Sequence, residues 1–510
     1  MSQLKSGAVL NYAVIFLNMG VGLLYTPFML RMMGQSEYGL YSLVASVISY
    51  LTILDLGLGN AIVRYTAQFR TQGKLQEQYE MFGMFLILYA VIGGIALLVG
   101  VGLYRQVDAW FGHSLTLDEL EKIKIMLVFL IFNLVVTFPM SIFGSILLAY
   151  ERFVFPKVVQ IARILLNTAV MIVLLEMGYR AVAMVVVQTV FNLLSLWLNF
   201  HYCRKKLHIR IHFRRFRWNL LKEISLYSFW IFLSVIMDRI YWNTGQFVLA
   251  LYVNTAAVAV FAVAIQLSIL YMSFSTSISG VFLPKVTSMV TNRANRKELS
   301  DLFIRTGRIQ YMVMALILSG FIVFGQDFIR LWAGTDYEQA YFISLLFFVS
   351  LTIPMIQNLG ITILQARNQM KFRALLYLGI ACVSLLLQFV WAGKYGGMGC
   401  AVAISGALLL GQGLVMNLYY HFKQGLDMLA FWKEIARMSV VPLFLCIMFR
   451  YVLNRIVLDG WLSLGTAILL FVAIYLPLFI RWGMNESEKN LLFTPLRKWK
   501  IGISHDRNQR

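Results

Sequence analysis

The sequence predicts an all-α, polytopic membrane protein with about fourteen transmembrane helices. Of its 510 residues, 60% are hydrophobic and only 13% are charged, whereas a soluble globular chain is nearer half apolar and a quarter charged. The apolar residues form blocks of roughly 20 residues, long enough to cross a bilayer core of about 30 Å as helices. The blocks lack the alternation of barrel strands, and open strands cannot span lipid with unpaired edges.

Short polar clusters separate the predicted spans, whose edges are defined to within a few residues. The first block is longer than the apolar core of a cleavable signal peptide, and no small-residue cleavage site follows it. The spans cover about residues 9–31, 40–60, 81–103, 125–149, 158–178, 181–202, 225–250, 256–282, 309–329, 341–364, 374–393, 399–420, 438–456 and 462–481.

The net charge of +21 invites comparison with nucleic-acid-binding proteins, which gather Lys and Arg on one folded face. Here the basic residues lie mostly in every second gap between apolar blocks. This alternation follows the positive-inside rule and predicts that both termini are cytoplasmic, which requires an even number of spans. We therefore expect no nucleic acid as a partner. The most basic gap, residues 203–222, is expected to contact anionic membrane lipids.

The chain repeats itself at an offset of about 215 to 217 residues. Thr137-Phe-Pro139-Met in the fourth span recurs as Thr352-Ile-Pro354-Met in the tenth, and the turn at Gly178 is echoed near Gly399. Parallel repeats are a transporter architecture. The predicted organisation is a six-helix bundle (1–202), a basic cytoplasmic linker (203–222), a second six-helix bundle (223–422), and two additional transmembrane helices with a basic cytoplasmic tail (423–510).

The opening region has a distinctive pattern. It runs Leu4-Lys5, an apolar helix with Pro27-Phe28, Gly34-Gln-Ser-Glu-Tyr-Gly-Leu-Tyr41, then Asp55-Leu-Gly-Leu-Gly59 and Arg64-Tyr65. With the chain length, span number and repeat, this pattern resembles the polysaccharide flippases (Wzx-type O-antigen and exopolysaccharide transporters) of the multidrug/oligosaccharidyl-lipid/polysaccharide exporter superfamily. The resemblance covers essentially the whole chain.

The resemblance implies two six-helix bundles around a central cavity in the bacterial cytoplasmic (inner) membrane. It implies export by alternating access of an undecaprenyl-pyrophosphate-linked oligosaccharide to the periplasmic face. Such a substrate serves cell-surface polysaccharide biosynthesis, including the O-antigen of lipopolysaccharide. Other polysaccharide-assembly proteins would be partners.

Charges inside apolar blocks are costly and often functional. Asp238 and Arg239 lie near the middle of the seventh span, and Asn243 follows about one turn later. We hypothesise that Arg239 contacts an anionic pyrophosphate or glycan and that Asp238 pairs with a cation or binds a coupling ion. The alternative is an interhelical salt bridge with a neighbouring span.

Three further charged residues lie in or near the cytoplasmic half of a predicted span. Asp55 precedes Gly57 and Gly59, which can loosen a helix or allow close packing, and Arg64 follows at the predicted cytoplasmic end. These two form either an ion or gate site or a polar cluster at a helix end. Arg163 in the fifth span either lines the cavity or extends to the headgroups.

Pro139 and Pro354 occupy matching positions in the two repeats and predict helix kinks. Gln357 and Asn358 follow Pro354 by about one turn, where their amides could bind sugar hydroxyls or cross-link helices. We place Asp238, Arg239, Asn243, Gln357, Asn358, Asp55, Arg64 and Arg163 as candidate cavity residues.

The sequence gives no support for an enzyme. It contains no phosphate-cradling Gly-rich loop, no metalloprotease His pair and no Gly-x-Ser-x-Gly elbow. His208 and His212 have helical i,i+4 spacing but no third ligand nearby, so we predict no metal site and no cofactor.

Any driving force for transport would come from an ion gradient (H⁺ or Na⁺), the substrate gradient or a partner. An ion-coupled multidrug antiporter is the main alternative function, and a membrane polysaccharide polymerase is disfavoured by the short outer loops.

Overall fold

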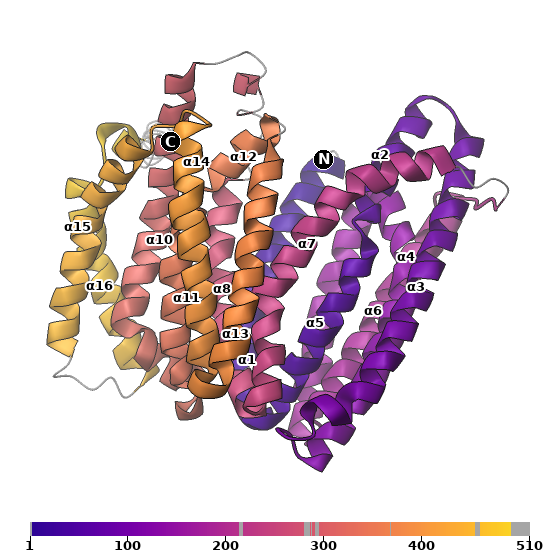
Figure 1. Ribbon diagram of the computed structural model, residues 1–510, viewed down its shortest axis with the longest axis horizontal. Coiled ribbons are helices and arrows are strands. Elements are labelled where there is room, and N and C mark those ends of the chain that lie inside the picture. The colour runs from indigo at the N-terminus through magenta and orange to yellow at the C-terminus, as the bar shows by residue number, and fades with distance from the viewer. Residues whose placement is uncertain are drawn as a thin grey trace, which may run out of the picture. The chain divides into compact units, whose positions relative to one another are not determined.

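The computed structural model describes residues 3–213, 218–279, 286, 288–290, 295–367, 369–453 and 460–490. Every regular element in these ranges is helical, which agrees with the predicted fold class. Figure 1 shows the elements, which are α1 (Gln3–Leu51), η1 (Thr52–Asp55), α2 (Leu58–Thr71), α3 (Leu75–Phe111), α4 (Leu117–Ala149), α5 (Val154–Glu176), α6 (Ala181–Lys205), α7 (Trp218–Tyr252), α8 (Thr255–Ser279), α10 (Arg296–Trp332), η3 (Thr335–Tyr337), α11 (Gln339–Ile356), α12 (Asn358–Ala366), α13 (Met370–Leu408), η4 (Leu409–Val415), α14 (Met416–Phe422), α15 (Met428–Leu453) and α16 (Trp461–Trp482).

Each predicted span falls on helical segments as far as the described residues extend, and residues 280–282 and 454–456 of two spans lie outside them. Among the described residues, 11 helical segments are long and apolar enough to cross a membrane. Two of these segments, Val9–Thr71 and Met370–Phe422, each cover two predicted spans. In each of the two, two helices meet at a glycine with non-helical backbone, Gly34 (φ 79°, ψ 170°) or Gly396 (φ 57°, ψ −140°). The predicted span 225–250 lies in α7, which has 35 residues. The chain is therefore a multi-pass membrane protein.

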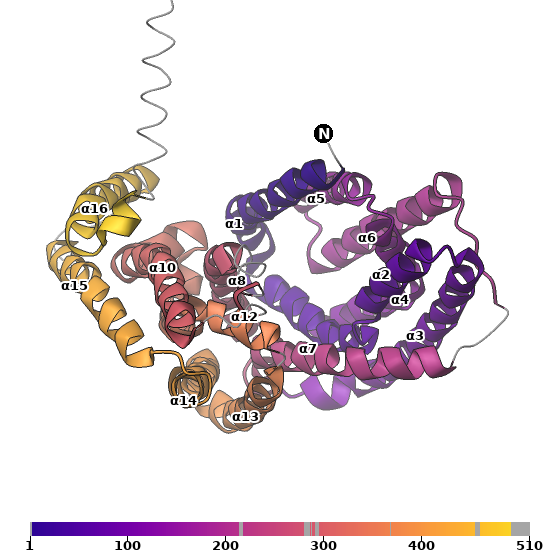
Figure 2. The same cartoon turned by 90° about the horizontal axis from the view of Figure 1, so that it is seen from above.

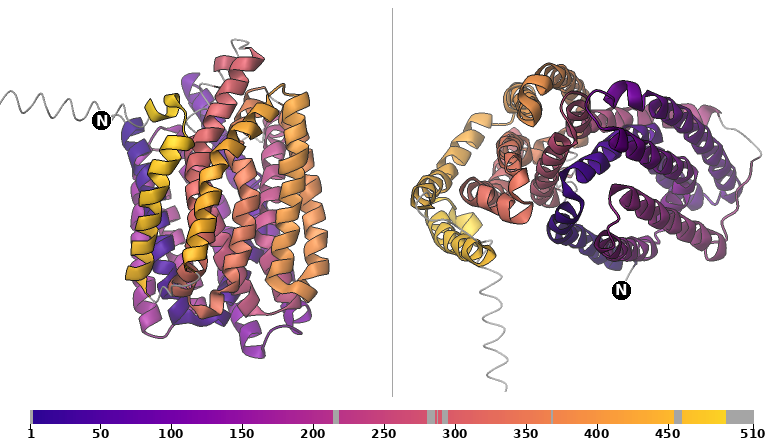
Figure 3. Two further views of the ribbon diagram at one scale, coloured as in Figure 1. Left: turned by 90° about the vertical axis from the view of Figure 1, so that its left-hand side faces the viewer. Right: turned by 90° about the horizontal axis from the view of Figure 1, so that it is seen from below.

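The chain divides into two compact units. Unit 1 comprises Met1–Val263 with Tyr377–Ile404, and unit 2 comprises Ala264–Leu376 with Ser405–Arg510. In unit 1, α4 packs against α2, α3 and α6, while α1 packs against α5 (Figure 2). In unit 2, α10 packs against α11, α15 and α16 (Figure 3). The predicted boundaries at 202, 222 and 422 stay predictions, and parts of the predicted linker (214–217) and of the last segment (454–459 and 491–510) lie outside the described residues.

The parallel repeat is visible in the helices themselves. Helices α3 and α10 both have 37 residues, and both ends lie 221 positions apart (296 − 75 and 332 − 111). The α5–α6 pair carries a stacked Phe155–Tyr202 contact with ring centroids 4.1 Å apart. Phe372 and Tyr419 make the same contact at 4.1 Å, and each lies 217 positions later (372 − 155 and 419 − 202).

The turns confirm the register and correct one detail. His208 (φ 51°) after α6 and Gly425 (φ 70°) after α14 are both left-handed and lie 217 positions apart. The turn glycine that matches Gly178 (φ 88°) is Gly396 (φ 57°) rather than Gly399. Helix α6 ends at Lys205, so His208 and His212 lie outside a helix and their spacing does not place them on one helical face.

A polar cluster closes one end of unit 1, where α1 bends, α4 begins and α8 begins. Glu119 forms a capping box with Thr116 at the start of α4. The other carboxylate oxygen of Glu119 accepts hydrogen bonds from Ser36 (2.6 Å) and Thr255 (2.8 Å). A Cβ on Gly39 would lie 2.0 Å from the Thr255 carbonyl oxygen. The glycine therefore allows α1 to meet the start of α8 backbone to backbone.

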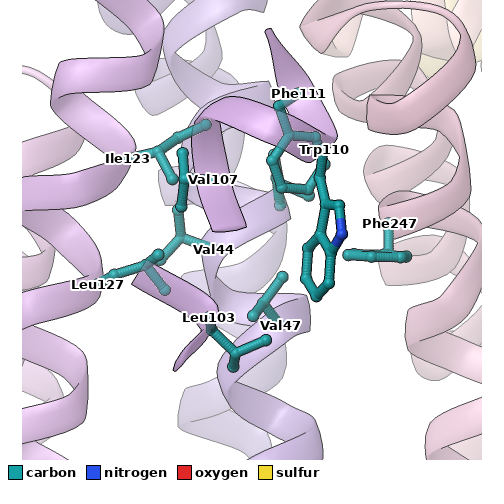
Figure 4. A pocket seen from close by; sticks show the side chains of 10 residues that line it. Val44, Val47, Leu103, Val107, Trp110, Phe111, Ile123, Leu127 and Phe247 are labelled. Atoms are coloured by element: carbon teal, nitrogen blue, oxygen red, sulfur yellow. The ribbon is translucent and has the colours of Figure 1, made fainter. Parts of the chain in front are cut away.

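Apolar side chains fill the space next to this cluster. The Phe247 ring of α7 meets Trp110 and Phe111 of α3 edge-on, with centroids 5.9 and 5.7 Å apart (Figure 4). Val44 and Val47 of α1, Leu103 and Val107 of α3, and Ile123 and Leu127 of α4 line the same small apolar pocket. Apolar side chains therefore fill most of the space among these helices.

The Glu119 contacts predict a pH-dependent stability. Burial alone would raise the pKa of Glu119, but hydrogen bonds from Ser36, Thr116 and Thr255 outweigh it and hold the pKa below its usual value. This stabilisation is present above the ordinary Glu value of about 4.3 and is lost as pH falls through the lower pKa of the folded state. We expect Glu119→Gln to lower the Tm at pH 7 and the difference from wild type to vanish in acid. Thermal unfolding of the purified protein across pH measures this, and the exposed Glu121→Gln serves as control; a constant difference at all pH values would contradict it.

An ion triad joins α10 to the last two helices of unit 2. The Arg308 guanidinium on α10 binds Glu488, just after α16, with Nε and Nη2 at 2.6 and 2.8 Å from its two oxygens. It also binds Glu434 on α15, whose side chain is partly exposed. The exposed fractions of the Arg308 and Glu488 side chains are 4% and 2%. The Arg308–Glu488 pair is therefore shielded from water and ties the segment after α16 to α10.

Removing Arg308 should show how much this triad contributes to the free energy of unfolding. Because Arg308→Met leaves two carboxylates without their cation, we expect a loss of about 3–5 kcal/mol of unfolding free energy. Arg305→Met changes an exposed arginine of the same helix and should change stability by less than about 0.5 kcal/mol. Denaturation monitored in detergent compares the two variants, and equal effects would show that Arg308 does not fasten the helices.

Candidate substrate-binding site

The second predicted span is broken at Asp55. The helix narrows to a 3-10 turn over Thr52–Asp55, after which Leu56 (φ 52°) and Gly57 (φ 70°) are both left-handed. This is the loosening that the glycines predicted. The Asp55 carboxylate accepts a hydrogen bond of 2.9 Å from the hydroxyl of Tyr89, a fully buried residue of α3. The break thus holds a carboxylate inside the membrane with a neutral partner.

Helix α1 packs against α7, and a hydrogen bond joins Tyr50 of α1 to Thr244 of α7. The 3-10 turn η1, which ends at Asp55, also packs against α7. The break at Asp55 therefore lies beside the helix that carries Asp238, Arg239 and Asn243.

The α7 residues differ in their surroundings. Arg239 is half-buried, and its Nε is buried with no hydrogen-bond partner in the structure. Asp238 is exposed on the helix surface, and Asn243 is half-buried beside Thr244. Leaving a buried guanidinium nitrogen without a hydrogen-bond partner costs free energy. A bound substrate group could supply that partner, so this arginine is a candidate binding residue.

Arg163 is the centre of a second polar group, formed by α4, α5 and α6. Its Nη1 donates to the Asn192 side-chain oxygen at 3.0 Å. The Asn192 amide nitrogen donates in turn to Asn133 (2.8 Å) and to Thr137 (2.9 Å). We call these four residues the Arg163 cluster. Thr137 lies two residues before Pro139, and α4 continues through that proline.

The partners of Arg163 are neutral. The hydrogen bond that its guanidinium makes is to an amide oxygen, and no ion pair to Arg163 occurs among the described residues. No carboxylate in the described part of the chain therefore pairs with its positive charge. A half-buried, uncompensated arginine surrounded by amides can hold an anionic group and hydrogen-bond to hydroxyls next to it.

The second repeat lacks this cluster. At the offset of 217, Arg163 corresponds to Ile380 and Asn192 to Leu409. The same helices thus pack in the second repeat with apolar side chains at these positions. A role limited to holding helices together would not require the polar residues in one copy only, so the asymmetry favours a binding role for the Arg163 cluster.

The amides near Pro354 are in unit 2 and are mostly engaged with each other. The helix is interrupted at Gln357 (φ −106°, ψ 12°), three residues after the proline. Gln357 is 3% exposed, and its amide nitrogen donates to the Asn417 oxygen at 2.9 Å. Trp432 donates to the same oxygen at 2.7 Å. In this conformation Gln357 cross-links helices; Asn358 is half-buried beside it.

Arg64 stands apart from Asp55. It is exposed on α2, and its guanidinium lies 5.6 Å from the ring centroid of Tyr65.

Three residues of the site are not among the predicted ones, namely Asn133, Thr137 and Tyr89. Asn133 and Thr137 carry a signal, since they are polar, one helical turn apart and inside an apolar block. Tyr89 carries none, because tyrosine is common in such blocks.

The Arg163 cluster predicts a separation of stability from transport. The double variant Arg163→Ile with Asn192→Leu reproduces the second-repeat pair. Because Asn133 and Thr137 then lose the donor that Asn192 supplies, stability should fall by about 1–3 kcal/mol, while transport by the folded protein should fall below a tenth of wild type. Protein level, Tm and transport in a host lacking the gene provide the measurements. Full transport by the double variant would assign the cluster to packing alone.

Comparisons with known proteins agree with the resemblance seen in the sequence. The model of the family described as "Polysaccharide biosynthesis protein" matches residues 4–290, more than half of the chain. The "Uncharacterized membrane protein EpsK" of Bacillus subtilis (strain 168) is 20% identical over 97% of this chain and 98% of its own length. The "Putative O-antigen transporter" of Shigella flexneri is 20% identical over 77% of this chain and 92% of its own length.

Solved structures share the fold. "Lipid II flippase MurJ" in an inward closed conformation has a TM-score of 0.68 at 17% identity, covering 96% of this chain and 99% of that one. An inward-facing multidrug resistance MATE family transporter of the MOP superfamily has a TM-score of 0.61 at 14% identity, covering 81% and 99%. The chain therefore has the fold of these membrane transporters.

Proposed function

Because the chain belongs to the polysaccharide biosynthesis protein family, we propose that it flips a lipid-linked oligosaccharide, carried on undecaprenyl pyrophosphate, from the cytoplasmic to the periplasmic face of the bacterial inner membrane. Transport would proceed by alternating access with both termini in the cytoplasm. The exported unit would serve cell-surface polysaccharide assembly.

The Arg163 cluster is the observation that carries this proposal. A pyrophosphate-linked glycan combines a doubly charged anion with many hydroxyl groups. An arginine with neutral partners suits the anion, and amides and a hydroxyl suit the sugar. Arg239, with its unpartnered Nε, supplies a second cation in unit 1. The similarity of the chain to a lipid II flippase in fold and to an O-antigen transporter in sequence supports the same substrate class.

The acidic residues have a separate role in this proposal. Asp55 is bound by a neutral hydroxyl and lies at a helix break, where the backbone can change conformation. Asp238 lies on α7, the helix against which η1 packs. A carboxylate at a break inside the membrane can bind a coupling cation, H⁺ or Na⁺, and the same groups would serve a cation antiporter. Antiport is therefore the second candidate that the experiment must separate.

The test is deletion of the gene in its host, with lipid-linked intermediates and surface glycan measured by mass spectrometry. We expect loss of one surface glycan and accumulation of its lipid-linked unit on the cytoplasmic face. Arg239→Glu should fail to restore export at normal protein level, because charge reversal repels the pyrophosphate. Asp238→Asn, which removes a charge without repelling an anion, should retain binding of the lipid-linked unit and slow its export.

Two other results would contradict the proposal or part of it. A normal surface glycan combined with new sensitivity to cationic drugs would replace flipping by antiport. Full export by Arg239→Glu would remove Arg239 from the site while leaving the Arg163 cluster to be judged by its own variant.

A further inference from the structure

A pair of arginines lies at one end of unit 2, where α12 ends, α10 begins and α14 ends. Arg367 follows the last residue of α12, and Arg296 is the first residue of α10. The Arg367 Nη1 donates to the backbone oxygen of Gln424 (3.0 Å) and to its side-chain oxygen (2.8 Å). The Arg296 Cδ and Nε would lie 2.9 and 3.2 Å from a Cβ placed on Gly425. The two guanidinium groups therefore flank the dipeptide Gln424-Gly425.

The position of Arg367 is set by a buried amide. Gln424 is 4% exposed, and its amide nitrogen donates to Gln369 (2.8 Å) and to the hydroxyl of Tyr419 (3.2 Å). These bonds orient its side-chain oxygen toward Arg367. Only Nη1 is used there, so Nε and Nη2 of the guanidinium fork remain available for a ligand.

Neither arginine of the pair has a carboxylate bound to it. Among the described residues, neither Arg296 nor Arg367 forms an ion pair, and Glu298 lies two residues further along α10. Burial and the neighbouring charge of Arg296 lower the pKa of Arg367. The nearby Asp427 carboxylate is used to cap the Ala430 backbone nitrogen at 2.9 Å. Two arginines that face each other without a carboxylate repel, and the repulsion is relieved when an anion binds both.

The start of α10 adds to this imbalance. The N-cap residue Asn295 makes no side-chain capping hydrogen bond, so the first backbone N–H groups of α10 keep their donor capacity. A cation such as Arg296 is unfavourable at the positive end of a helix, whereas an anion is favourable there. The 37-residue helix and the two arginines thus favour the same kind of ligand.

The first repeat lacks the pair. At the offset of 217, Arg367 corresponds to Tyr150, and Gln424-Gly425 corresponds to Leu207-His208. Helix α3 begins at Leu75, where α10 begins at Arg296. The matching corner of the first repeat has one arginine on another element, since Arg70 of α2 lies 4.5 Å from the ring centroid of Tyr150. The facing pair of arginines is thus particular to the second repeat.

We propose that Arg296 and Arg367 form a phosphate-binding site at this end of unit 2, which takes the phosphate or pyrophosphate group of an anionic lipid. Each planar guanidinium binds phosphate oxygens through two parallel N–H groups. The positive-inside pattern predicts that this end is cytoplasmic, the side on which anionic headgroups are abundant. The site involves none of the residues of the Arg163 cluster and stands independently of the proposed substrate.

Binding to the purified full-length chain in detergent tests the site. The probes are inorganic pyrophosphate and short-chain phosphatidylglycerol, with short-chain phosphatidylcholine as the neutral reference. We expect Arg296→Gln and Arg367→Gln each to weaken binding of the anionic probes about tenfold or more, as the loss of a charged hydrogen bond does. The matched controls Lys297→Gln and Lys371→Gln remove the same charge from exposed neighbours and should change affinity less than about twofold.

The two probes identify the source of the phosphate. Arginine-dependent binding of both, with mutual competition, shows recognition of the phosphate group itself. Binding of phosphatidylglycerol alone assigns the site to a phospholipid headgroup, and binding of pyrophosphate alone assigns it to a pyrophosphate group. Equal losses in the lysine controls, or unchanged affinity in both arginine variants, would overturn the proposal.

The unliganded variants distinguish binding from a structural role. Arg367 holds Gln424, so Arg367→Gln can destabilise the fold by itself. Arg296 makes no such bond, and its removal relieves like-charge repulsion. Arg296→Gln should therefore keep or raise the Tm without ligand and lose the stabilisation that pyrophosphate or phosphatidylglycerol gives to wild type. A lowered Tm with undiminished ligand stabilisation would show that Arg296 is structural.

Discussion

The close approach of α1 to the start of α8 at Gly39 is the contact on which the junction of α1, α4 and α8 depends. Since glycine has no side chain, the Thr255 carbonyl reaches the place that a Cβ would occupy. Further along α1, Tyr50 is hydrogen-bonded to Thr244 of α7, and η1 packs against the same helix. A side chain at Gly39 would separate α1 from the start of α8, because a contact of 2.0 Å cannot be accommodated by rotamer changes alone. Glu119 holds the same junction by hydrogen bonds from both sides.

The repeated scaffold separates what folding requires from what function requires. Features found in both copies, such as the stacked pairs Phe155–Tyr202 and Phe372–Tyr419, maintain the helix hairpins. Polar groups found in one copy, such as Arg163 with Asn192, are not needed for those hairpins. In lipid an unsatisfied polar group is expensive, so a polar group without a scaffold role is retained only where it has another use.

The sequence predicts the spans well because apolar blocks of the right length have few alternatives in a bilayer. It does not show which residues of different helices meet. Pairing of Arg163 with Asn192 depends on how α5 and α6 are rotated about their axes, which periodicity does not determine when a helix is apolar on nearly every face. The break at Asp55 was suggested by Gly57, whereas its partner Tyr89 was not. The left-handed His208 shows the converse error, in which a helical spacing was assumed where the helix had ended.

The sign of the uncompensated charge bears on the kind of substrate. A transporter for cations needs carboxylates that face the substrate, and an arginine beside them lowers its affinity for cations. In unit 1 the carboxylate of Asp55 is bound to a tyrosine, while the Arg163 guanidinium is oriented by neutral amides. Such a guanidinium keeps its full charge for a ligand, and its amide partners already form the hydrogen bonds that hold it in place. Less ordering is then required when an anion binds, so the arrangement favours a large anionic substrate over a small cation.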